Sequence, residues 1–330
     1  MSMAEPLAPL RKKARLMGAY LRGRPVWCTW QLTPRCGAHC AFCEHRAEGG
    51  VEEATSEEAI AISQSFDAIG TMVVSLSGGE PFLRDDLASI VGTLSATHFV
   101  LLTTHGFLVT ESRARAVWES GLDGASVVLE DANPEQHDAR VGVPGAFGRA
   151  VAALECLART RARPGQQVNV KTRVSPDRHE HLPRLLDIAE RFGATVSVEA
   201  AYPVAQGTRS DVSARLVQLK RNRSTLRTRA SVLARFDEAS NGGVGGCLAA
   251  KAFLNVDHLG RVSRCAEIRP PEEVIADLRR PTAPGELLAA LNRVHRANTC
   301  RSCWSGSRGE VEAVYSLRGL VSLLPDLLRS

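Results

Sequence analysis

Three cysteines near the N-terminus have the spacing of a metal site. Cys36, Cys40 and Cys43 form a CxxxCxxC pattern within the segment TPRCGAHCAFCEHR. Three thiolates bound to a cubane of four irons leave one iron without a protein ligand, and this open iron can bind substrate. A structural zinc site is the alternative, in which His39 or His45 would complete a Cys3His set. The spacing alone leaves both kinds of site open.

Four more cysteines near the C-terminus form a second candidate metal site. Cys247 and Cys265 flank Gly260, with twelve residues before this glycine and four after it, and Cys300 and Cys303 follow as a CxxC pair. Such a set could enclose either zinc or a second iron–sulfur cluster. With four thiolates either one would be fully ligated, so that no open position would remain for a substrate.

The composition, with 44% hydrophobic and 23% charged residues, is that of an ordinary globular protein. No apolar run approaches the roughly 18 to 20 residues that cross a bilayer, and the N-terminus lacks the apolar core of a secretion signal, so we expect a cytoplasmic protein without a membrane span. In that reducing compartment an odd count of nine cysteines indicates metal ligands rather than disulfides. Two of the nine, Cys28 and Cys156, are expected to pack in the core.

The formal net charge of +5 is modest, and basic residues concentrate at positions 11–24 and 220–235. The second of these runs carries no aromatic residue that could stack on a base. We therefore expect both runs to be solvated helix faces, and we expect no nucleic-acid partner.

Six β-rich runs, each followed by a loop and a helical pattern, would position the cysteines. Six consecutive right-handed βα units favour a curved and partly closed parallel sheet, so the predicted fold is α/β, a partial (β/α)6 TIM-like barrel. Function is expected at the carboxyl ends of the strands, and the first cysteine group directly follows the first strand. The six runs are 26–32, 71–77, 98–104, 125–130, 167–174 and 195–200.

A glycine-rich segment, NGGVGG, indicates a domain boundary after the barrel. One long polar helix is predicted before it, over residues 213–239, and a β-hairpin after it, over residues 252–265. An amphipathic helix that begins at Val311 and is interrupted by Pro325 is expected to close the chain. The predicted parts are an N-terminal helical extension (1–25), the barrel (26–240) and a small C-terminal cluster-binding domain (241–330).

Two further features associate the first cysteine group with a known family. Phe42 lies immediately before the third cysteine, and SGGEP (77–81) stands at the end of the second predicted strand. With these features the sequence resembles the radical S-adenosylmethionine (SAM) superfamily, whose motifs are CxxxCxΦC and GGE. The resemblance implies that a 4Fe-4S cluster at the cysteine triad binds SAM, and that SAM is cleaved to a 5′-deoxyadenosyl radical that abstracts a hydrogen atom from the substrate.

The resemblance also assigns residues to SAM binding, although it names no catalytic residue. The GGE segment would hold the SAM amine through its backbone and acidic side chain, a strand-end serine would contact the ribose, and an arginine would contact the carboxylate. In the segment HDARVG (137–142) the arginine stands one position earlier than in the family's HDxxRG pattern. An arginine on the fifth strand is therefore a second candidate. His105, after the third strand, is expected to make a structural hydrogen bond. The assigned residues are Phe42, Ser77, Gly78, Gly79, Glu80, Ser126, Arg140 and Arg173.

The C-terminal cysteines resemble the SPASM and twitch domains of radical SAM proteins. Full SPASM domains carry further cysteines, at positions that Gly309 and Ala313 occupy in this chain. The resemblance therefore implies the shorter twitch form with one auxiliary 4Fe-4S cluster, which makes two clusters in all. Because that cluster has no open iron, it would accept an electron from the substrate radical, and this indicates an oxidation.

The implied function is that of a radical SAM dehydrogenase for a small molecule such as a sugar, cyclitol or cofactor precursor, with an electron donor such as flavodoxin or ferredoxin. Crosslinking of a ribosomally made peptide is an alternative that uses the same machinery, although the 25 residues before the first strand are too few for a leader-binding domain. A non-catalytic zinc protein is a third hypothesis, which leaves the SGGEP segment unexplained.

Overall fold

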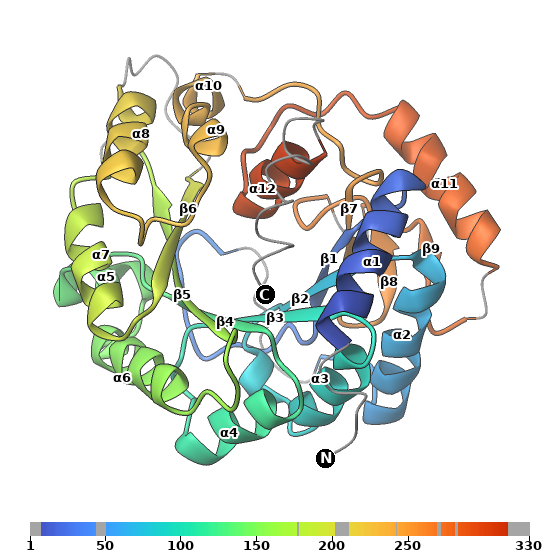
Figure 1. The fold of residues 1–330 in the computed structure, drawn as a ribbon, viewed down its shortest axis with the longest axis horizontal. Coiled ribbons are helices and arrows are strands. Elements are labelled where there is room, and N and C mark those ends of the chain that lie inside the picture. The colour runs from blue at the N-terminus through green and yellow to red at the C-terminus, as the bar shows by residue number, and fades with distance from the viewer. Residues whose placement is uncertain are drawn as a thin grey trace.

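The computed structural model describes residues 8–43, 51–176, 178–201, 211–241, 243–268, 272–280 and 283–315. Within them, a nine-stranded sheet has the order β6-β5-β4-β3-β2-β1-β7-β8-β9, and β1 to β6 are parallel. Figure 1 shows these strands as an arc with helices along its outer side, which confirms the predicted α/β partial barrel. The six strands are β1 (Trp27–Gln31), β2 (Val73–Ser77), β3 (Phe99–Thr104), β4 (Gly124–Val128), β5 (Gln167–Val174) and β6 (Thr195–Ala200).

The outer helices form where the sequence provides both an apolar face and end signals. The second helix, α2, begins at a capping box in which Thr55 and Glu58 each bind the other's backbone N–H, and it ends at Gly70, whose φ is +86°. A further helix, α1 (Ala8–Leu21), lies within the predicted N-terminal extension. The outer helices are α2 (Ser56–Ile69), α3 (Leu87–Ser95), α4 (Glu111–Glu119), α5 (Pro134–Val141), α6 (Ala146–Arg159), α7 (Leu182–Arg191) and α8 (Val212–Asn222).

The strands β4 to β6 direct apolar side chains toward the helices and polar side chains into the barrel. Val170 on β5 is fully buried in the core, whereas its neighbour Lys171 faces the interior and forms an ion pair of 2.8 Å with Glu199 on β6. On the same face, the Asn169 amide donates to the Ser126 hydroxyl at 3.3 Å. We use the name polar interior for the inward-facing residues Ser126, Asn169, Lys171, Arg173, Ser197 and Glu199.

The C-terminal part of the chain adds strands to the same sheet. β7 (Phe253–Val256) lies parallel to β1, and β8 (Arg261–Ser263) pairs antiparallel with β7, which confirms the hairpin predicted over residues 252–265. A short β9 (Ala276–Asp277) follows at the edge. Both sides of the predicted boundary at residue 241 thus share one sheet, and the division of the chain into domains stays a prediction.

The single long helix predicted over residues 213–239 is wrong. After α8 come two short helices, α9 (Ala230–Leu233) and α10 (Phe236–Ser240). Between α8 and α9 the chain runs along the edge strand β6, where the Val196 amide donates to the Thr225 carbonyl at 2.8 Å and the Arg227 amide donates to the Val196 carbonyl at 2.7 Å. These bonds satisfy the open edge of the sheet, and they outweigh the helix propensity of the segment.

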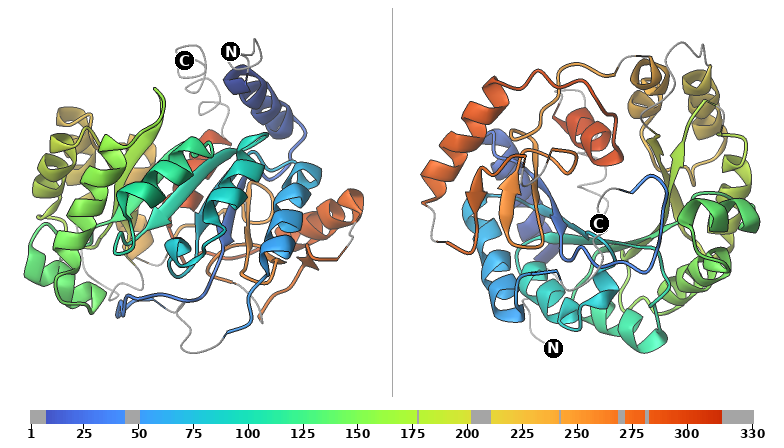
Figure 2. Two further views of the ribbon diagram at one scale, coloured as in Figure 1. Left: turned by 90° about the horizontal axis from the view of Figure 1, so that it is seen from below. Right: turned by 180° about the vertical axis from the view of Figure 1, so that it is seen from behind.

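Two helices lie before and after Cys300 and Cys303 in the sequence, α11 (Pro284–Arg296) and α12 (Gly306–Val314). In Figure 1 and in the reverse view of Figure 2, α12 lies in the opening between the two arms of the arc. The closing helix predicted from Val311 is described only at its start, because residues 316–330 lie outside the described part. Among the described residues no single helix is long and apolar enough to cross a membrane. The helices α5 and α6, which are bent relative to each other, are together long and apolar enough by length and composition alone.

Candidate functional site

The first cysteine group lies on the loop that follows β1, at the carboxyl end of the barrel strands. Cys36 and Cys40 are half-buried and Cys43 is exposed. A cavity of about 210 Å³ brings them together, and its lining is Cys36, Ala38, His39, Cys40 and Cys43. Burial, reinforced by the neighbouring sulfurs of Cys43 and Cys36, raises the pKa of Cys40 to about 12. Binding of a metal or a cluster here must therefore displace protons from thiols.

Zinc and an iron–sulfur cluster place different demands on the three thiols. Among the described residues, no three or more His, Cys, Asp or Glu side chains gather closely enough to hold one metal ion. Zinc requires its sulfur ligands about 2.3 Å from a single point. A cubane distributes its thiolates over separate irons, so it fits a wider triad. His45, one of the predicted zinc ligands, lies outside the described residues.

The cysteine loop is held against the turn that follows β2. The Gly79 amide donates to the Thr33 carbonyl at 2.6 Å, and the Glu80 amide donates to the Arg35 carbonyl at 2.8 Å. A Cβ on Gly79 would lie 2.0 Å from the Arg35 carbonyl oxygen. A Cβ on Gly78, whose φ is +123°, would lie 2.5 Å from the Thr33 carbonyl oxygen. Both glycines are therefore required by the close approach of two backbones.

Glu80 is fully buried behind this turn. Its carboxylate accepts hydrogen bonds from the Thr104 hydroxyl at 2.8 Å and from the amides of Phe82 and His105 at 3.0 Å. These bonds cap the short helix η1 (Pro81–Leu83) and join the end of β2 to the end of β3. Burial outweighs them and raises the pKa of Glu80 to about 7. The side chain thus supports the turn from behind, and its direct contact with SAM stays a prediction.

Three more residues for which the sequence predicts a role, Ser77, Ser126 and His105, lie on strands or just after a strand. The Ser77 carbonyl accepts from the Leu32 amide at 2.9 Å, which joins β2 to the start of the cysteine loop. Ser126 is half-buried in the polar interior, and its predicted contact with the SAM ribose stays a prediction. Nδ1 of His105 accepts from the Phe107 amide at 3.2 Å, which confirms the predicted structural hydrogen bond.

The other side of the cysteine loop rests on the C-terminal end of α5. The His39 amide donates to the Val141 carbonyl at 2.8 Å, and the Ala41 amide donates to the Arg140 carbonyl at 3.4 Å. The helix ends at Gly142, whose φ is +71° and where a Cβ would lie 2.7 Å from the His39 carbonyl oxygen. The HDARVG segment therefore supports the loop through backbone contacts.

Arg140 and Arg173 share one buried carboxylate beside the cysteine loop. Arg173 donates to Oε1 of Glu130 through Nε at 3.0 Å and Nη2 at 2.6 Å, and Nη2 of Arg140 lies 3.3 Å from Oε2. The Arg173 guanidinium also lies 3.2 Å from the centre of the Phe42 ring. The structure thus brings Phe42, Arg140 and Arg173 together. Two arginines and one carboxylate leave a net positive charge there, which favours an anionic group in a ligand.

Glu53 is a positioning residue that the sequence did not indicate. Its carboxylate accepts from the Thr33 hydroxyl at 2.6 Å and from the Arg35 guanidinium at 2.6 and 3.2 Å. Burial acts to raise the pKa of Glu53, but the hydrogen bonds from Arg35 and Thr33 prevail and lower it. Glu53 is therefore an anion that holds the entrance of the cysteine loop. No local pattern marks it, because its partners lie about twenty residues away in sequence.

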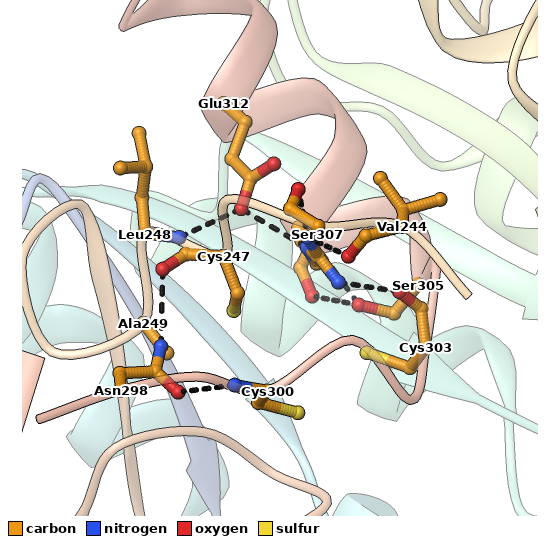
Figure 3. A network of polar contacts seen from close by, with 12 residues as sticks. Val244, Cys247, Leu248, Ala249, Asn298, Cys300, Cys303, Ser305, Ser307 and Glu312 are labelled. Carbon is orange, nitrogen blue, oxygen red and sulfur yellow. Dashed lines mark hydrogen bonds and ion pairs between the residues drawn. The ribbon is translucent and has the colours of Figure 1, made fainter. Parts of the chain in front are cut away.

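The second cysteine group lies at the opposite end of β1. Cys247 precedes β7, which is parallel to β1, and Cys265 follows the antiparallel β8, so both pack near Val26 at the amino end of β1. Figure 3 shows the sulfurs of Cys247, Cys300 and Cys303 around a common space. Cys265 packs against the same apolar cluster as Cys247. Burial, reinforced by the sulfurs of Cys303 and Cys247, raises the pKa of Cys265 to about 12.

Asn298 joins the two halves of this second group. Its side-chain amide donates to the Cys247 carbonyl at 3.0 Å, and its side-chain oxygen accepts from the Cys300 amide at 3.2 Å. Figure 3 shows both bonds. The fully buried Cys28 and the half-buried Cys156 pack in or against the core, as predicted. The four C-terminal cysteines therefore form a set that fits a fully ligated cluster, and the identity of the bound group stays a prediction.

Residues 30–169 match the family model described as Radical SAM superfamily. This segment contains the cysteine triad, the GGE turn and the Arg140 region. The fold and the site define a partial α/β barrel that carries a cysteine loop after its first strand. The chain thus carries a radical SAM domain over residues 30–169.

Curated relatives with established names match the chain over part of their length. The AdoMet-dependent heme synthase of Methanosarcina barkeri is 33% identical over 192 residues, which cover 57% of this chain and 54% of the relative. The mycofactocin maturase MftC of Mycolicibacterium smegmatis is 29% identical over 197 residues, which cover 58% of this chain and 49% of the relative. The chain thus spans about half the length of these relatives.

Solved structures share the fold over a longer stretch. Streptococcus suis SuiB bound to S-adenosylmethionine has a TM-score of 0.65 and 16% identity, with 83% of this chain and 69% of SuiB covered. The protein anSMEcpe with bound AdoMet has a TM-score of 0.62 and 12% identity, with 92% of this chain and 99% of that protein covered. At these identities the likeness concerns the fold alone.

Replacement of Gly79 by Ala is expected to reduce strongly the iron bound at the first cysteine group, because the new Cβ would lie 2.0 Å from the Arg35 carbonyl oxygen and displace the loop. Iron per chain after anaerobic reconstitution measures the effect. The control is Gly37→Ala, in the same loop, where a Cβ meets no atom within 4 Å. Equal iron contents in the two variants would contradict the steric explanation.

The Thr104→Val variant is expected to lose about 1 to 3 kcal/mol of unfolding free energy, because the buried Glu80 carboxylate would lose a hydrogen-bond donor. Denaturant unfolding of the metal-free chain measures the change. Thr103→Val is the matched control, since Thr103 lies on the same strand but makes no bond to Glu80 among the described contacts. A similar loss in both variants would show that Glu80 does not depend on this donor.

Proposed function

We propose that this protein is a radical SAM oxidoreductase of the twitch type, with an auxiliary 4Fe-4S cluster held by Cys247, Cys265, Cys300 and Cys303. The observation that carries this proposal is the position of the two cysteine groups at opposite ends of β1, in the same sheet whose strands β4 to β6 carry the polar interior. When bound, the first cluster and SAM supply a 5′-deoxyadenosyl radical, and the auxiliary cluster takes up an electron from the substrate. The residues of the chain position the substrate between these centres and exclude water.

Lys171 and Glu199 are the charged groups best placed to contact a substrate in the polar interior. They form an ion pair of 2.8 Å, and their side chains are 34% and 18% exposed, so solvent reaches both. Burial acts to raise the pKa of Glu199, but Lys171, and after it Arg173, lower it, so Glu199 is an anion at neutral pH. The pair thus offers one donor and one acceptor to a hydroxyl or amine group.

The proximity of α12 connects this pair to the second cysteine group. Gly306, three residues after Cys303, comes so close to Glu199 that a Cβ on Gly306 would lie 2.6 Å from Oε1. A substrate bound at Glu199 would therefore lie near the start of α12 and the preceding cysteine pair. This position suits a substrate that loses a hydrogen atom to the radical and then one electron and one proton, which yields a C=O or C=C bond.

We propose a small polar molecule as the substrate. The polar interior supports this class, and the heme synthase relative, by its name, makes a small molecule. Maturation of a ribosomally made peptide is the second candidate, because other relatives are named mycofactocin maturase MftC and PqqA peptide cyclase. A cell extract separated into small-molecule and peptide fractions distinguishes the two, since the fraction that holds the substrate should raise 5′-deoxyadenosine formation above the uncoupled rate.

Metal analysis tests the proposed cofactors. Anaerobically reconstituted protein is expected to contain about eight irons per chain and matching sulfide. It should form 5′-deoxyadenosine from SAM when reduced chemically or by flavodoxin or ferredoxin. Stoichiometric zinc with little iron, or no 5′-deoxyadenosine from cluster-replete protein, would refute the proposed function.

Replacement of both Cys300 and Cys303 by Ala is expected to lower the iron content from about eight to about four per chain. The variant should still cleave SAM, because the first cluster is untouched, but it should not form product with the active extract fraction. Cys156→Ala, which removes a thiol that faces neither cluster, is the control. Full product formation by the double variant would exclude an electron-accepting role for the auxiliary cluster.

A further inference from the structure

Arg308, in the first turns of α12, is fully buried beside the second cysteine group. Its Nη1 donates to the Cys303 carbonyl at 2.6 Å, and its Nη2 donates to the carbonyls of Val244 at 2.7 Å and Gly245 at 3.2 Å. Its Nε donates to Oε1 of Glu312 at 3.0 Å. A fully buried arginine is rare, and its charge must be compensated by nearby groups.

These contacts surround two of the four proposed ligands. The guanidinium binds carbonyls just before Cys247 and the carbonyl of Cys303, and Glu312 accepts from the amide of Leu248, just after Cys247, at 2.8 Å. Figure 3 shows the bond between Leu248 and Glu312 next to Cys247. A planar guanidinium with five donors can hold several carbonyls in one geometry, which a lysine ammonium on a flexible stem cannot reproduce.

The guanidinium of Arg308 is shared between one carboxylate and three backbone carbonyls. Glu312 is its single ion-pair partner within the part of the chain that the structure describes. The remaining contacts are neutral carbonyl oxygens, together with the Trp304 ring at 5.4 Å. A cluster with four thiolates is negatively charged, and one-electron reduction makes it more negative. In a site of low dielectric, a fixed cation stabilises the more negative state the most.

We propose that Arg308 is the counter-charge of the auxiliary cluster: it holds the Cys247 and Cys303 segments together and raises the reduction potential of the cluster, so that the cluster accepts an electron from the substrate. This inference rests on the auxiliary cluster of the proposed function. Arg308 does not touch the substrate, and its role is that of a positioning residue that also sets a potential. The electron that the cluster accepts is the one that the substrate loses after hydrogen abstraction.

The test uses the full chain with Cys36, Cys40 and Cys43 replaced by Ala, so that the auxiliary cluster gives the only EPR signal. In this background Arg308→Met is expected to lower the equilibrium constant for one-electron reduction by tenfold or more, a potential shift of about 59 mV or more to lower values. Arg308→Lys should keep the potential close to that of the parent, because the charge is retained. Arg301→Met, at an exposed arginine between Cys300 and Cys303, should shift it little, because water screens the charge.

Glu312→Gln gives a second measurement of the potential, which does not depend on whether the Arg308 variants still form the auxiliary cluster. Oε1 of Glu312 accepts both of its hydrogen bonds, so a glutamine oxygen can keep them while the negative charge is removed. The potential should then rise above that of the parent, opposite to Arg308→Met. Unchanged potentials in Glu312→Gln and Arg308→Met would overturn the charge role. Absence of iron from the parent itself would instead refute the auxiliary cluster and the proposed function.

Discussion

The site depends on the close packing of backbone against backbone at the cysteine loop. Gly78 and Gly79 let the loop approach the turn after β2 within hydrogen-bond distance, and Gly142 does the same at the end of α5. The loop is therefore fixed from two sides by bonds that use no functional side chain. Because these bonds join backbone atoms, they fix the loop without using the cysteine side chains, and they make the glycines as necessary to the site as the cysteines.

Carboxyl groups that are buried or half-buried stabilise this arrangement. Glu80 joins β2 to β3, Glu130 binds Arg140 and Arg173, and Glu53 binds the start of the loop. A carboxyl group removed from water needs hydrogen-bond donors to satisfy it, so each of these groups also fixes the donors that surround it. Residues that the family resemblance assigns to SAM thus have protein partners that hold them in place. Their orientation is set before any ligand binds, which favours binding without a large loss of side-chain entropy.

Local sequence patterns were sufficient for most of the elements but not for the contacts between them. The six parallel strands and α2 follow from periodicity and end signals, as Thr55 and Gly70 illustrate. The helix predicted over 213–239 failed because the segment after α8 pairs with the edge of β6, and no local pattern reveals an open edge. Asn298 and Arg308 were missed for the same reason. Their partners, such as Cys247 and Val244, lie more than fifty residues away along the chain.

The pairing of β7 with β1 is the link between the two cysteine groups. Because the pair is parallel, the chain around Cys247 lies at the amino end of β1, while the cysteine triad lies beyond its carboxyl end. Five strand residues at about 3.3 Å each separate the ends by about 17 Å. Under the proposed function, a substrate in the polar interior would react with the radical formed at the cysteine triad and pass an electron toward the second cysteine group. The sheet is continuous from β6 to β8, so the backbone of the barrel itself fixes the separation of the two cysteine groups.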